Sequence, residues 1–592
     1  MEQSTKKPSN LVESLERSRK KFADNPIFAT KMNGQYRWID YKEFGSRVDH
    51  MRGGLAQLGI KKGDKVAIIA RNSVEWAVAA YASYSLGAVF VPMYENQTAA
   101  DWKYIIRDSH AKVVFSWEAS IHRQIVGMID EIADLQWAIN INGDKKESDT
   151  YDSLIEIGKT HPIEPYFPHS EDLMGLIYTS GTTGNPKGVM LSHGNILSNC
   201  YASAQMFSFA PGDVTLSFLP WAHIFGQVGE LHMLIYLGFA TGFAEGVHTI
   251  TDNLSEIKPT VLMAVPRIFN RIYDGVNAKM KDKGGPIAAL FYKGLELQQS
   301  KKEGSKLSLK EKILLGIAQK VVFAKVRQAF GGKLRYAISG AAALDPKVAH
   351  FVDNLGIVVF EGYGLSETSP MISANRLGAV KIGSVGQLIP EVKVVIDTSV
   401  ASGKTNEGEI IAYGPNIMQG YHNLPDETKK VMTDDGGFRT GDLGRLDKNG
   451  YLHITGRIKE QYKLENGKYV VPSPLEESLK LSPYIENAFI FGENRKHNVC
   501  LIGVNYEAVK NYAARKDIHD EDLLSNHEIR SLFAKELKKY KGPFKEYEVP
   551  KNFTLISEEW TPDNGFLTPS LKVKRRVVLE RYESQITGLY DS

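Results

Sequence analysis

The sequence predicts an α/β protein with layered, largely parallel sheets and more than one domain. Two observations support this prediction. Between residues 40 and about 270, amphipathic helical patterns alternate with short apolar runs, which is typical of α/β layers. The chain has 592 residues, which is too many for a single domain with one hydrophobic core, so we expect at least two domains.

The individual elements follow from hydrophobic periodicity. Helical patterns cover residues 41–58, 74–86 and 195–207. Apolar runs typical of buried strands cover 65–70, 88–91, 113–115, 173–178, 216–219, 261–265, 334–338 and 357–360. The apolar stretch 76–92 contains Ser and Gly and is shorter than the ~20 residues of a spanning helix, so we expect a buried helix followed by a strand.

The sequence pattern changes after residue 380. Short β-like runs with frequent Gly and Asn/Asp turns predict a β-rich subdomain over about 380–456. A charged stretch at 456–463 follows, and a mixed α+β tail closes the chain. We therefore expect a large N-terminal domain over residues 1–456 and a small C-terminal domain over residues 457–592.

Composition narrows the class of protein. The chain is 43% hydrophobic and 24% charged, as in soluble globular proteins, and its net charge of +3 gives no argument for a nucleic-acid partner. Cys200 and Cys500 are too few for a disulfide framework or a zinc site, which favours a reducing cytoplasm. The polar residues 1–20 contain no signal-peptide core. The sequence leaves the oligomeric state open.

Residues 279–335 form a basic segment with 14 Lys or Arg and four Asp or Glu, a local net charge of +10. Ile313, Ile317, Val321 and Ala324 fall on one helical face. Two interpretations stay open: a solvated helical hairpin packed on the domain, or a surface that contacts anionic lipid or an acidic partner.

A loop rich in Gly, Thr and Ser follows the predicted strand 173–178. It reads Tyr-Thr-Ser-Gly-Thr-Thr-Gly-Asn-Pro-Lys-Gly over residues 178–188. Glycines let backbone N–H groups converge on an anion, hydroxyls donate to phosphate oxygens, and Lys187 adds a positive charge. The alternative, a flexible surface turn, requires neither the hydroxyls nor the lysine. The loop is not a Walker A motif, because Lys187 precedes Gly188 rather than Ser or Thr.

This loop resembles the phosphate loop of the adenylate-forming superfamily, which comprises acyl-CoA synthetases, luciferases and peptide-synthetase adenylation domains. The resemblance extends over about residues 35–580, and with the basic segment it is similar to the long-chain acyl-CoA synthetases. It implies that nucleotide phosphates bind at Thr179, Ser180, Gly181, Thr182, Thr183, Gly184 and Lys187.

A second motif, Glu361-Gly-Tyr-Gly-Leu-Ser-Glu-Thr368, follows an expected strand. The resemblance implies that Tyr363 stacks on adenine, that Ser366 meets the phosphates and that Glu367, with Thr179, binds Mg²⁺. It also places Gly340 and Ala341, together with Glu361, Gly362 and Gly364, at the nucleotide. Asp442 and Arg457 match the residues that hold the ribose.

The remaining implied residues concern the carboxylate, the hinge and the channel. Lys572 matches the lysine that bridges carboxylate and α-phosphate, although Leu571 stands where the family usually has Gly, and Lys574 is a rival. Lys459 matches the hinge of a mobile C-terminal domain. His223 either positions the acyl carboxylate or is a satisfied core histidine. Trp221 and Gly467 are expected along the acyl and thiol channels.

The resemblance implies ATP-dependent activation of a fatty acid to an acyl-adenylate, with release of pyrophosphate and subsequent thioester formation with coenzyme A. Mg²⁺ is the implied cofactor, and an anionic membrane is an expected peripheral contact through 279–335. Two alternatives remain: a ligase that delivers the acyl group to a carrier-protein thiol or another acceptor, and a non-catalytic lipid-binding relative.

Overall fold

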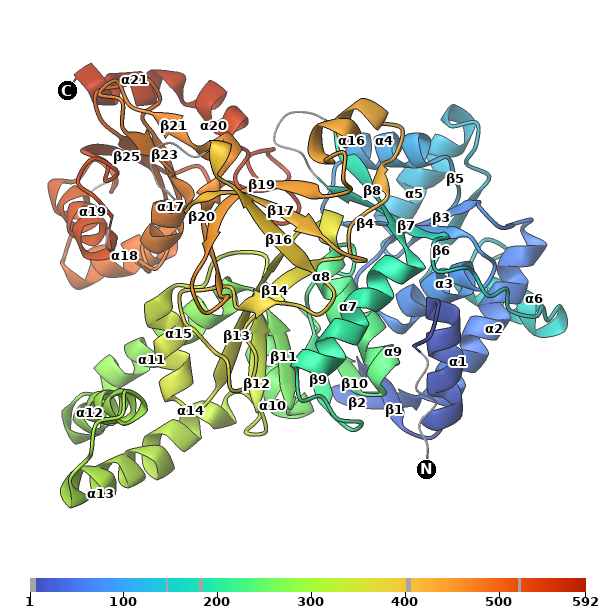
Figure 1. Cartoon of the computed structure of the whole chain (residues 1–592), viewed down its shortest axis with the longest axis horizontal. Coiled ribbons are helices and arrows are strands. Elements are labelled where there is room, and N and C mark those ends of the chain that lie inside the picture. Colours follow the sequence, from blue (N-terminus) through green and yellow to red (C-terminus); the bar gives the residue numbers. More distant parts are fainter. Residues whose placement is uncertain are drawn as a thin grey trace. The chain divides into compact units, whose positions relative to one another are not determined.

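The structure is a computed structural model that describes residues 7–144, 147–179, 185–246, 248–400, 406–519, 523–542 and 544–591. The chain splits into two compact units (Figure 1). Unit 1 comprises Met1–Val394 and Ala412–Phe438, and unit 2 comprises Val395–Ile411 and Arg439–Ser592. The second unit therefore takes in residues on the N-terminal side of the expected boundary at 457.

A seven-stranded sheet organises the first part of unit 1. Its strands, in spatial order, are β18 (Gly420–Tyr421), β8 (Lys187–Ser192), β7 (Leu173–Thr179), β4 (Val89–Met93), β3 (Lys65–Ile69), β5 (Ala111–Ser116) and β6 (Trp137–Asn140). The strands from β7 to β6 are parallel, whereas β8 runs antiparallel to both β7 and β18. Strands β3 and β4 are almost wholly buried, as their continuous apolar sequence predicts.

Two helices of this part begin at side-chain caps. The Asp40 carboxylate accepts the backbone N–H of Glu43 at the start of α2 (Tyr41–Gln57), and Ser73 accepts that of Trp76 at the start of α3 (Val74–Tyr84). Helix α3 is buried on nearly all sides and precedes β4, so the expected buried helix and strand are present. Within the described ranges, no helix combines the length and apolarity that a membrane span requires.

Two further sheets complete unit 1. One contains β11 (Val261–Ala264), β12 (Tyr336–Ser339), β13 (Val358–Gly364), β14 (Met371–Ala374) and β15 (Gln387–Leu388). The other contains β2 (Gln35–Asp40), β1 (Pro26–Met32), β10 (Ala240–Phe243) and β9 (Val214–Ser217). Strand β13 runs beyond its expected end at residue 360, because Gly362 and Tyr363 pair with β14.

The basic segment lies on helices inserted between β11 and β12, at the lower left of Figure 1. They are α11 (Pro266–Lys283), α12 (Gly285–Lys302), α13 (Leu309–Ala318), a π-helical turn η3 (Gln319–Phe323) and α14 (Ala324–Gln328). Helix α15 (Pro346–Asn354) packs against α11 and α12.

The described residues of unit 2 form three sheets. The four-stranded sheet of β16 (Lys393–Asp397), β17 (Gly408–Tyr413), β19 (Phe438–Leu446) and β20 (Leu452–Arg457) falls almost wholly within it. The hairpin β21 (Tyr462–Lys463) and β22 (Tyr469–Val470) precedes a sheet of β23 (Ile485–Phe491), β24 (Val499–Val504) and β25 (Asn552–Ile556). Its helices are α17 (Ser473–Leu479), α18 (Tyr506–Arg515), α19 (His527–Tyr540), α20 (Arg575–Arg581) and α21 (Glu583–Asp591).

Candidate functional site

The two ends of the expected phosphate loop lie side by side in unit 1. Thr179 ends β7 and Lys187 begins β8, and the antiparallel register pairs them. The Thr179 hydroxyl donates to the Lys187 carbonyl at 3.5 Å. Ser180, Gly181, Thr182, Thr183 and Gly184 lie outside the described residues, so their expected phosphate contacts remain predictions.

The Lys187 ammonium is held by Tyr421 of β18 and by Glu427, which follows this strand. Its Nζ lies 2.5 Å from Oε2 of Glu427 and 5.1 Å from the centre of the Tyr421 ring. Hydrogen bonds from Lys187 and then Lys430 lower the pKa of the Glu427 carboxyl to about 2, so this carboxylate is charged at neutral pH. A lysine paired in this way is already oriented, and it can exchange the carboxylate for another anion.

Tyr421 links Lys187 to Glu367, the predicted Mg²⁺ ligand. Its hydroxyl donates to Oε1 of Glu367 at 2.8 Å, and burial raises the pKa of this phenol. Backbone pairing fixes the arrangement: Tyr421 stands opposite Val189 on β8, and the Met418 N–H donates to the Glu367 carbonyl at 2.9 Å. Lys187 and Glu367 therefore meet on one tyrosine side chain. We call Lys187, Tyr421, Glu427 and Glu367 the phosphate-site cluster.

Glu367 fits the expected magnesium ligand. It lies on the 3-10 turn η4 (Ser366–Thr368), is partly exposed, and the Tyr421 hydroxyl bonds one of its two oxygens. Over the described ranges, no group of three or more His, Cys, Asp or Glu gathers as a protein-only metal site. Mg²⁺ is commonly bound by one or two carboxylates together with substrate phosphates, and an oriented Glu367 matches that donor set.

The expected adenine loop and the second motif are neighbours in the β11–β15 sheet. Ser339, which precedes Gly340, pairs with Glu361 in the parallel register of β12 and β13. Gly364 has no room for a side chain, because a Cβ there would lie 1.7 Å from the Pro370 carbonyl oxygen. Ala341 has a positive φ of 68°. The register thus places Gly340 and Ala341, which follow Ser339, beside the start of the motif that runs from Glu361 through Gly362, Tyr363 and Gly364 to the buried Ser366.

Glu361 braces the loop that follows Gly340. It is 8% exposed, and its Oε1 accepts the backbone N–H of Leu344 at 3.0 Å. Burial raises the pKa of this carboxyl to about 7, against an ordinary value of 4.5. Glu361 therefore carries much less charge than a surface glutamate near neutral pH.

His223 caps the short helix α8 (Ile224–Gln227). Its Nδ1 accepts the backbone N–H of Phe225 at 3.2 Å. The Phe225 ring in turn lies 3.4 Å from the place that a Cβ on Gly340 would occupy. The His223 segment is thus adjacent to the expected adenine loop, and its contact with an acyl carboxylate remains a prediction.

Trp221 lies in the core of unit 1. It is 1% exposed and packs edge-to-face against Trp76, at 5.3 Å between ring centres, and Phe243, at 5.5 Å. Its backbone N–H donates to the Asn72 side chain at 2.9 Å. These contacts account for its burial without an acyl channel, so a gating role remains a prediction.

In unit 2, the expected ribose residues stand opposite each other. Asp442 on β19 pairs in register with Arg457 on β20, and the Arg457 Nε donates to Oδ1 of Asp442 at 2.8 Å. The Asp442 side chain is 5% exposed and that of Arg457 is 44% exposed. The pair holds an oriented, largely buried carboxylate on β19, whose oxygens can accept hydrogen bonds from vicinal hydroxyls.

Lys572 lies in a tight turn of unit 2. The Lys572 N–H donates to the Thr568 hydroxyl at 3.0 Å, and the Thr568 N–H donates to the Lys572 carbonyl at 2.8 Å. Leu571 has a positive φ of 62°, a backbone conformation that Gly adopts more readily than Leu. The Lys572 side chain is exposed, whereas that of Lys574, which directly precedes α20, is partly buried.

The hinge and thiol-channel residues also lie in unit 2. Lys459 is exposed on the 3-10 turn η6 (Ile458–Glu460) directly after Arg457. Gly467 has a positive φ of 83° in the hairpin between β21 and β22. These positions are compatible with the expected roles, which stay predictions.

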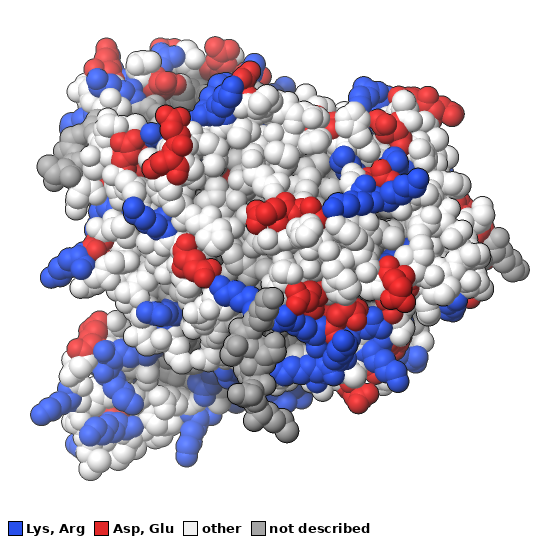
Figure 2. All heavy atoms as spheres, turned by 45° about the vertical axis from the view of Figure 1, so that its right-hand side comes forward, with Lys and Arg blue, Asp and Glu red and all other residues white. Residues whose placement is uncertain are grey.

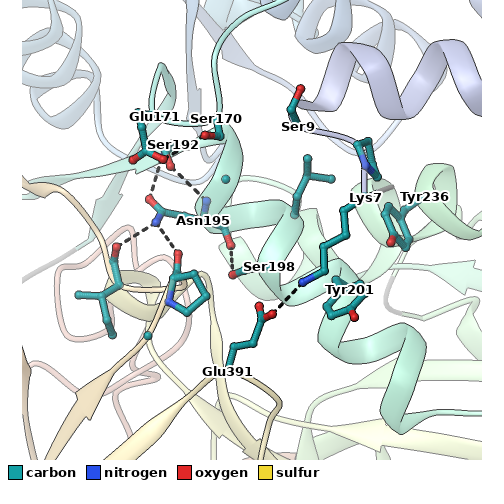
Figure 3. A pocket seen from close by; sticks show the side chains of 16 residues that line it. Lys7, Ser9, Ser170, Glu171, Ser192, Asn195, Ser198, Tyr201, Tyr236 and Glu391 are labelled. Carbon is teal, nitrogen blue, oxygen red and sulfur yellow. Dashed lines mark hydrogen bonds and ion pairs between the residues drawn. The ribbon is translucent and has the colours of Figure 1, made fainter. Parts of the chain in front are cut away.

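A separate cavity of about 440 Å³ lies beside the start of α7 (His193–Met206) in unit 1 (Figure 3). Lys7 reaches across it to Glu391 at 2.8 Å and covers the Tyr201 ring at 3.3 Å. Asn195 donates to the carbonyls of Pro415 and Ile417 at 2.8 and 2.9 Å. In the described part of the chain, no predicted nucleotide residue lines this cavity.

Sequence reasoning missed Tyr421 and Glu427. Glu427 is 240 residues from Lys187, and Tyr421 is 54 residues from Glu367. The available signal was weak: a Gly-Tyr pair followed by a short acidic helix, α16 (Pro425–Val431). Only the pairing of β18 with β8 makes these residues neighbours of the phosphate loop.

Comparisons with known proteins agree with this geometry. Residues 15–422 match the family described as AMP-binding enzyme, and residues 459–592 match the AMP-binding enzyme C-terminal domain. The chain is 30% identical over 618 residues to the peroxisomal long chain acyl-CoA synthetase 7 of Arabidopsis thaliana, which covers 98% of this chain and 86% of that protein. It is 30% identical over 582 residues to the long-chain-fatty-acid–CoA ligase FadD15 of Mycobacterium tuberculosis, with 96% and 95% covered.

Solved structures share the fold. The adenylation domain of a carboxylate reductase from Mycobacterium chelonae aligns with a TM-score of 0.81 at 21% identity, covering 98% of this chain and 91% of that one. ATP-bound MatB from Rhodopseudomonas palustris aligns with a TM-score of 0.72 at 23% identity, covering 98% and 100%. The predicted α/β fold class is confirmed.

Proposed function

Because the chain belongs to the AMP-binding enzyme family, within the adenylate-forming superfamily that its motifs predicted, we propose that it is a long-chain fatty acid–CoA ligase. In this proposal it first joins a fatty acid to AMP at the expense of ATP, with release of pyrophosphate. It then transfers the acyl group to the thiol of coenzyme A, with release of AMP.

The observation that carries the proposal is the phosphate-site cluster. A carboxylate and a triphosphate repel each other, so the site must neutralise charge and align the attacking oxygen with the α-phosphorus. Lys187 would leave Glu427 and bind the β- and γ-phosphates, which offer more negative charge. Tyr421 would keep Glu367 oriented throughout. Mg²⁺, when bound, neutralises charge on the phosphate oxygens, and Glu367 is the residue that would hold it.

Residues of unit 2 would complete the two reactions. Asp442 and Arg457 would hold the ribose, and Lys572 would bridge the fatty carboxylate and the α-phosphate during adenylation. Rotation about Lys459 would then withdraw Lys572 and bring the Gly467 hairpin to the thiol path. These roles follow the family resemblance residue by residue.

Pyrophosphate release tests the proposal. The full-length protein is assayed with ATP, Mg²⁺ and fatty acids of graded chain length, with and without coenzyme A. We expect pyrophosphate that depends on a long-chain acid and acyl-CoA that appears only with coenzyme A. Lys187→Met should lower both products, whereas Lys112→Met, a paired lysine on β5 outside the phosphate-site cluster, should not.

Three other results would each reject part of this proposal. Pyrophosphate release with bound acyl-adenylate but no acyl-CoA would indicate delivery to a carrier-protein thiol or another acceptor. Fatty acid binding without pyrophosphate would indicate a non-catalytic relative. Activity confined to short acids would leave the ligase chemistry intact and reject the long-chain substrate.

A further inference from the structure

An apolar stripe on the basic helices points into solvent. Leu309, Ile313, Ile317 and Val321 are 75%, 57%, 45% and 45% exposed. They are four residues apart along α13 and η3, so they lie on one side of the helix. We call these four residues the apolar ridge.

The fold does not require the apolar ridge. The opposite side of the same helix supplies the buried residues Leu315, Ala318, Val322 and Phe323. This inner side packs tightly: a Cβ on Gly294 of α12 would lie 2.6 Å from the Ala318 Cβ, and the Phe291 and Phe323 rings meet edge-to-face at 5.9 Å. The helix therefore has two apolar sides, and only the inner one anchors it to unit 1.

Lysines surround the apolar ridge. Lys306, Lys310, Lys312, Lys320 and Lys325 are all exposed, and none of them forms an ion pair with another described residue. Figure 2 shows mainly Lys and Arg among the charged groups of this lobe, at its lower left, with uncharged surface between them. The lysines are therefore available to an external anion.

The few acidic groups nearby are occupied. Glu311 accepts the N–H and hydroxyl of Ser308 in a capping box, both at 2.8 Å. Glu296 pairs with Lys293 at 2.7 Å. The five lysines outnumber Glu296, Glu303 and Glu311, so the surface around the apolar ridge keeps a net positive charge.

We propose that the apolar ridge and its lysines dock this protein on the surface of an anionic lipid bilayer. Apolar side chains that cost free energy in water can enter the headgroup boundary, while lysines extend their ammonium groups to lipid phosphates. A second copy of this chain is a poorer occupant, because the same face would oppose lysine to lysine. A convex helix with interspersed lysines also offers no groove for a peptide.

Vesicle sedimentation tests the docking without ATP or fatty acid, so its outcome is independent of the proposed function. Full-length protein is mixed with vesicles of phosphatidylcholine alone or of phosphatidylcholine with phosphatidylglycerol. We expect retention on the anionic vesicles that weakens as salt rises, and little retention on the neutral ones.

Two variants separate the charge from the apolar ridge. Ile313→Gln with Ile317→Gln should lower the partition coefficient about tenfold, because two half-exposed side chains no longer enter the lipid boundary. Lys310→Gln, Lys312→Gln and Lys320→Gln together should lower it about a hundredfold, since each lysine near an anionic surface contributes about fivefold.

Two matched controls make the same kinds of substitution at exposed positions away from the apolar ridge. Val126→Gln with Ile157→Gln changes two exposed residues on α5 (Ala119–Met128) and α6 (Tyr151–Thr160). Lys516→Gln, Lys535→Gln and Lys538→Gln removes three exposed lysines of unit 2. Both controls should bind vesicles like the unaltered protein. Far-UV circular dichroism checks that every variant is folded.

Several outcomes would overturn the docking surface. Equal retention on neutral vesicles would reject the need for anionic lipid. Undiminished binding of folded Ile313→Gln with Ile317→Gln would leave only nonspecific charge attraction. Equal losses in the controls would place the contact elsewhere. A self-association that disappears with the same ridge variant, measured by sedimentation velocity without lipid, would identify a second copy as the occupant.

Discussion

Replacing Tyr421 by Phe isolates one hydroxyl at the centre of the phosphate-site cluster. The ring under the Lys187 ammonium stays, and so does its packing, because Tyr421 is 8% exposed. What disappears is the donation to Oε1 of Glu367 at 2.8 Å. Without this hydrogen bond, the Glu367 carboxylate is no longer held in place before Mg²⁺ and the triphosphate bind. If Glu367 is the Mg²⁺ ligand, its carboxylate must therefore become ordered during catalysis.

The expected magnitude follows from that hydrogen bond. A hydrogen bond to a charged group contributes about 1.5–3 kcal/mol. Glu367 is partly exposed, so water replaces some of the loss, and about 1–2 kcal/mol remains. This predicts a fall of about 5- to 30-fold in kcat/KM for MgATP and a requirement for more Mg²⁺.

Pyrophosphate-release kinetics across a range of Mg²⁺ concentrations measure this effect. Tyr413→Phe is the matched control, because it also removes a phenol that donates to a carboxylate, that of Asp435, at 3.1 Å. It should leave the kinetics unchanged. A folded Tyr421→Phe variant with unaltered kcat/KM and unaltered Mg²⁺ dependence would refute the reasoning.

Three further predictions concern separate parts of the chain. Lys572→Ala should lose adenylation yet keep thioester formation from supplied acyl-adenylate, as followed by pyrophosphate and acyl-CoA assays; equal loss of both would move the essential role elsewhere, with Lys574→Ala as the comparison. Leu571→Gly should raise the free energy of unfolding by about 0.5–1 kcal/mol, as measured by urea titration. It relieves roughly 1–2 kcal/mol of strain in the left-handed backbone conformation, which exceeds the cost of the greater backbone entropy of Gly in the unfolded chain. A lower free energy of unfolding would contradict the strained turn. The stability that neutral Glu361 contributes should be complete below pH 4.5 and lost as the pH rises through about 7, because the folded protein binds this proton more tightly. Urea unfolding on both sides of that window should show Glu361→Gln with a flatter pH dependence than the unaltered protein, and an identical dependence would count against the buried neutral carboxyl.

The sequence could predict residues that belong to contiguous motifs. Asp442 and Arg457 were expected as a functional pair, and the register of β19 and β20 places them face to face. Lys187 and Glu367 were likewise expected at one phosphate site, and Tyr421 lies between them. Local motifs carry such information because their backbone geometry is set within a few residues.

The missed residues depend on long-range pairing. Strand β18 consists of only two residues, Gly420 and Tyr421, so the sequence shows no hydrophobic periodicity that would predict it. Its neighbour β8 is far away in the sequence, and the partner choice follows from the whole sheet. The contribution of Tyr421 and Glu427 to the site was therefore not accessible from local pattern.

The helix α13 shows a different limit. The sequence predicted a face that includes Ile313, Ile317 and Val321, but periodicity alone does not say whether an apolar face turns inward. The helix has a second apolar side, with Leu315 and Ala318 buried, and tertiary packing selects that side for the core. The exposed face becomes visible only when the packing is known.

A structure of the full chain with a nonhydrolysable ATP analogue, bridged by carbon between the α- and β-phosphates, tests the central claim most directly. The account predicts β- and γ-phosphate oxygens within hydrogen-bonding distance of the Lys187 ammonium, which has left Glu427, and a metal ion on the Glu367 carboxylate. A triphosphate bound elsewhere, with Lys187 still paired to Glu427 and Glu367 bonded to Tyr421 alone, would contradict it.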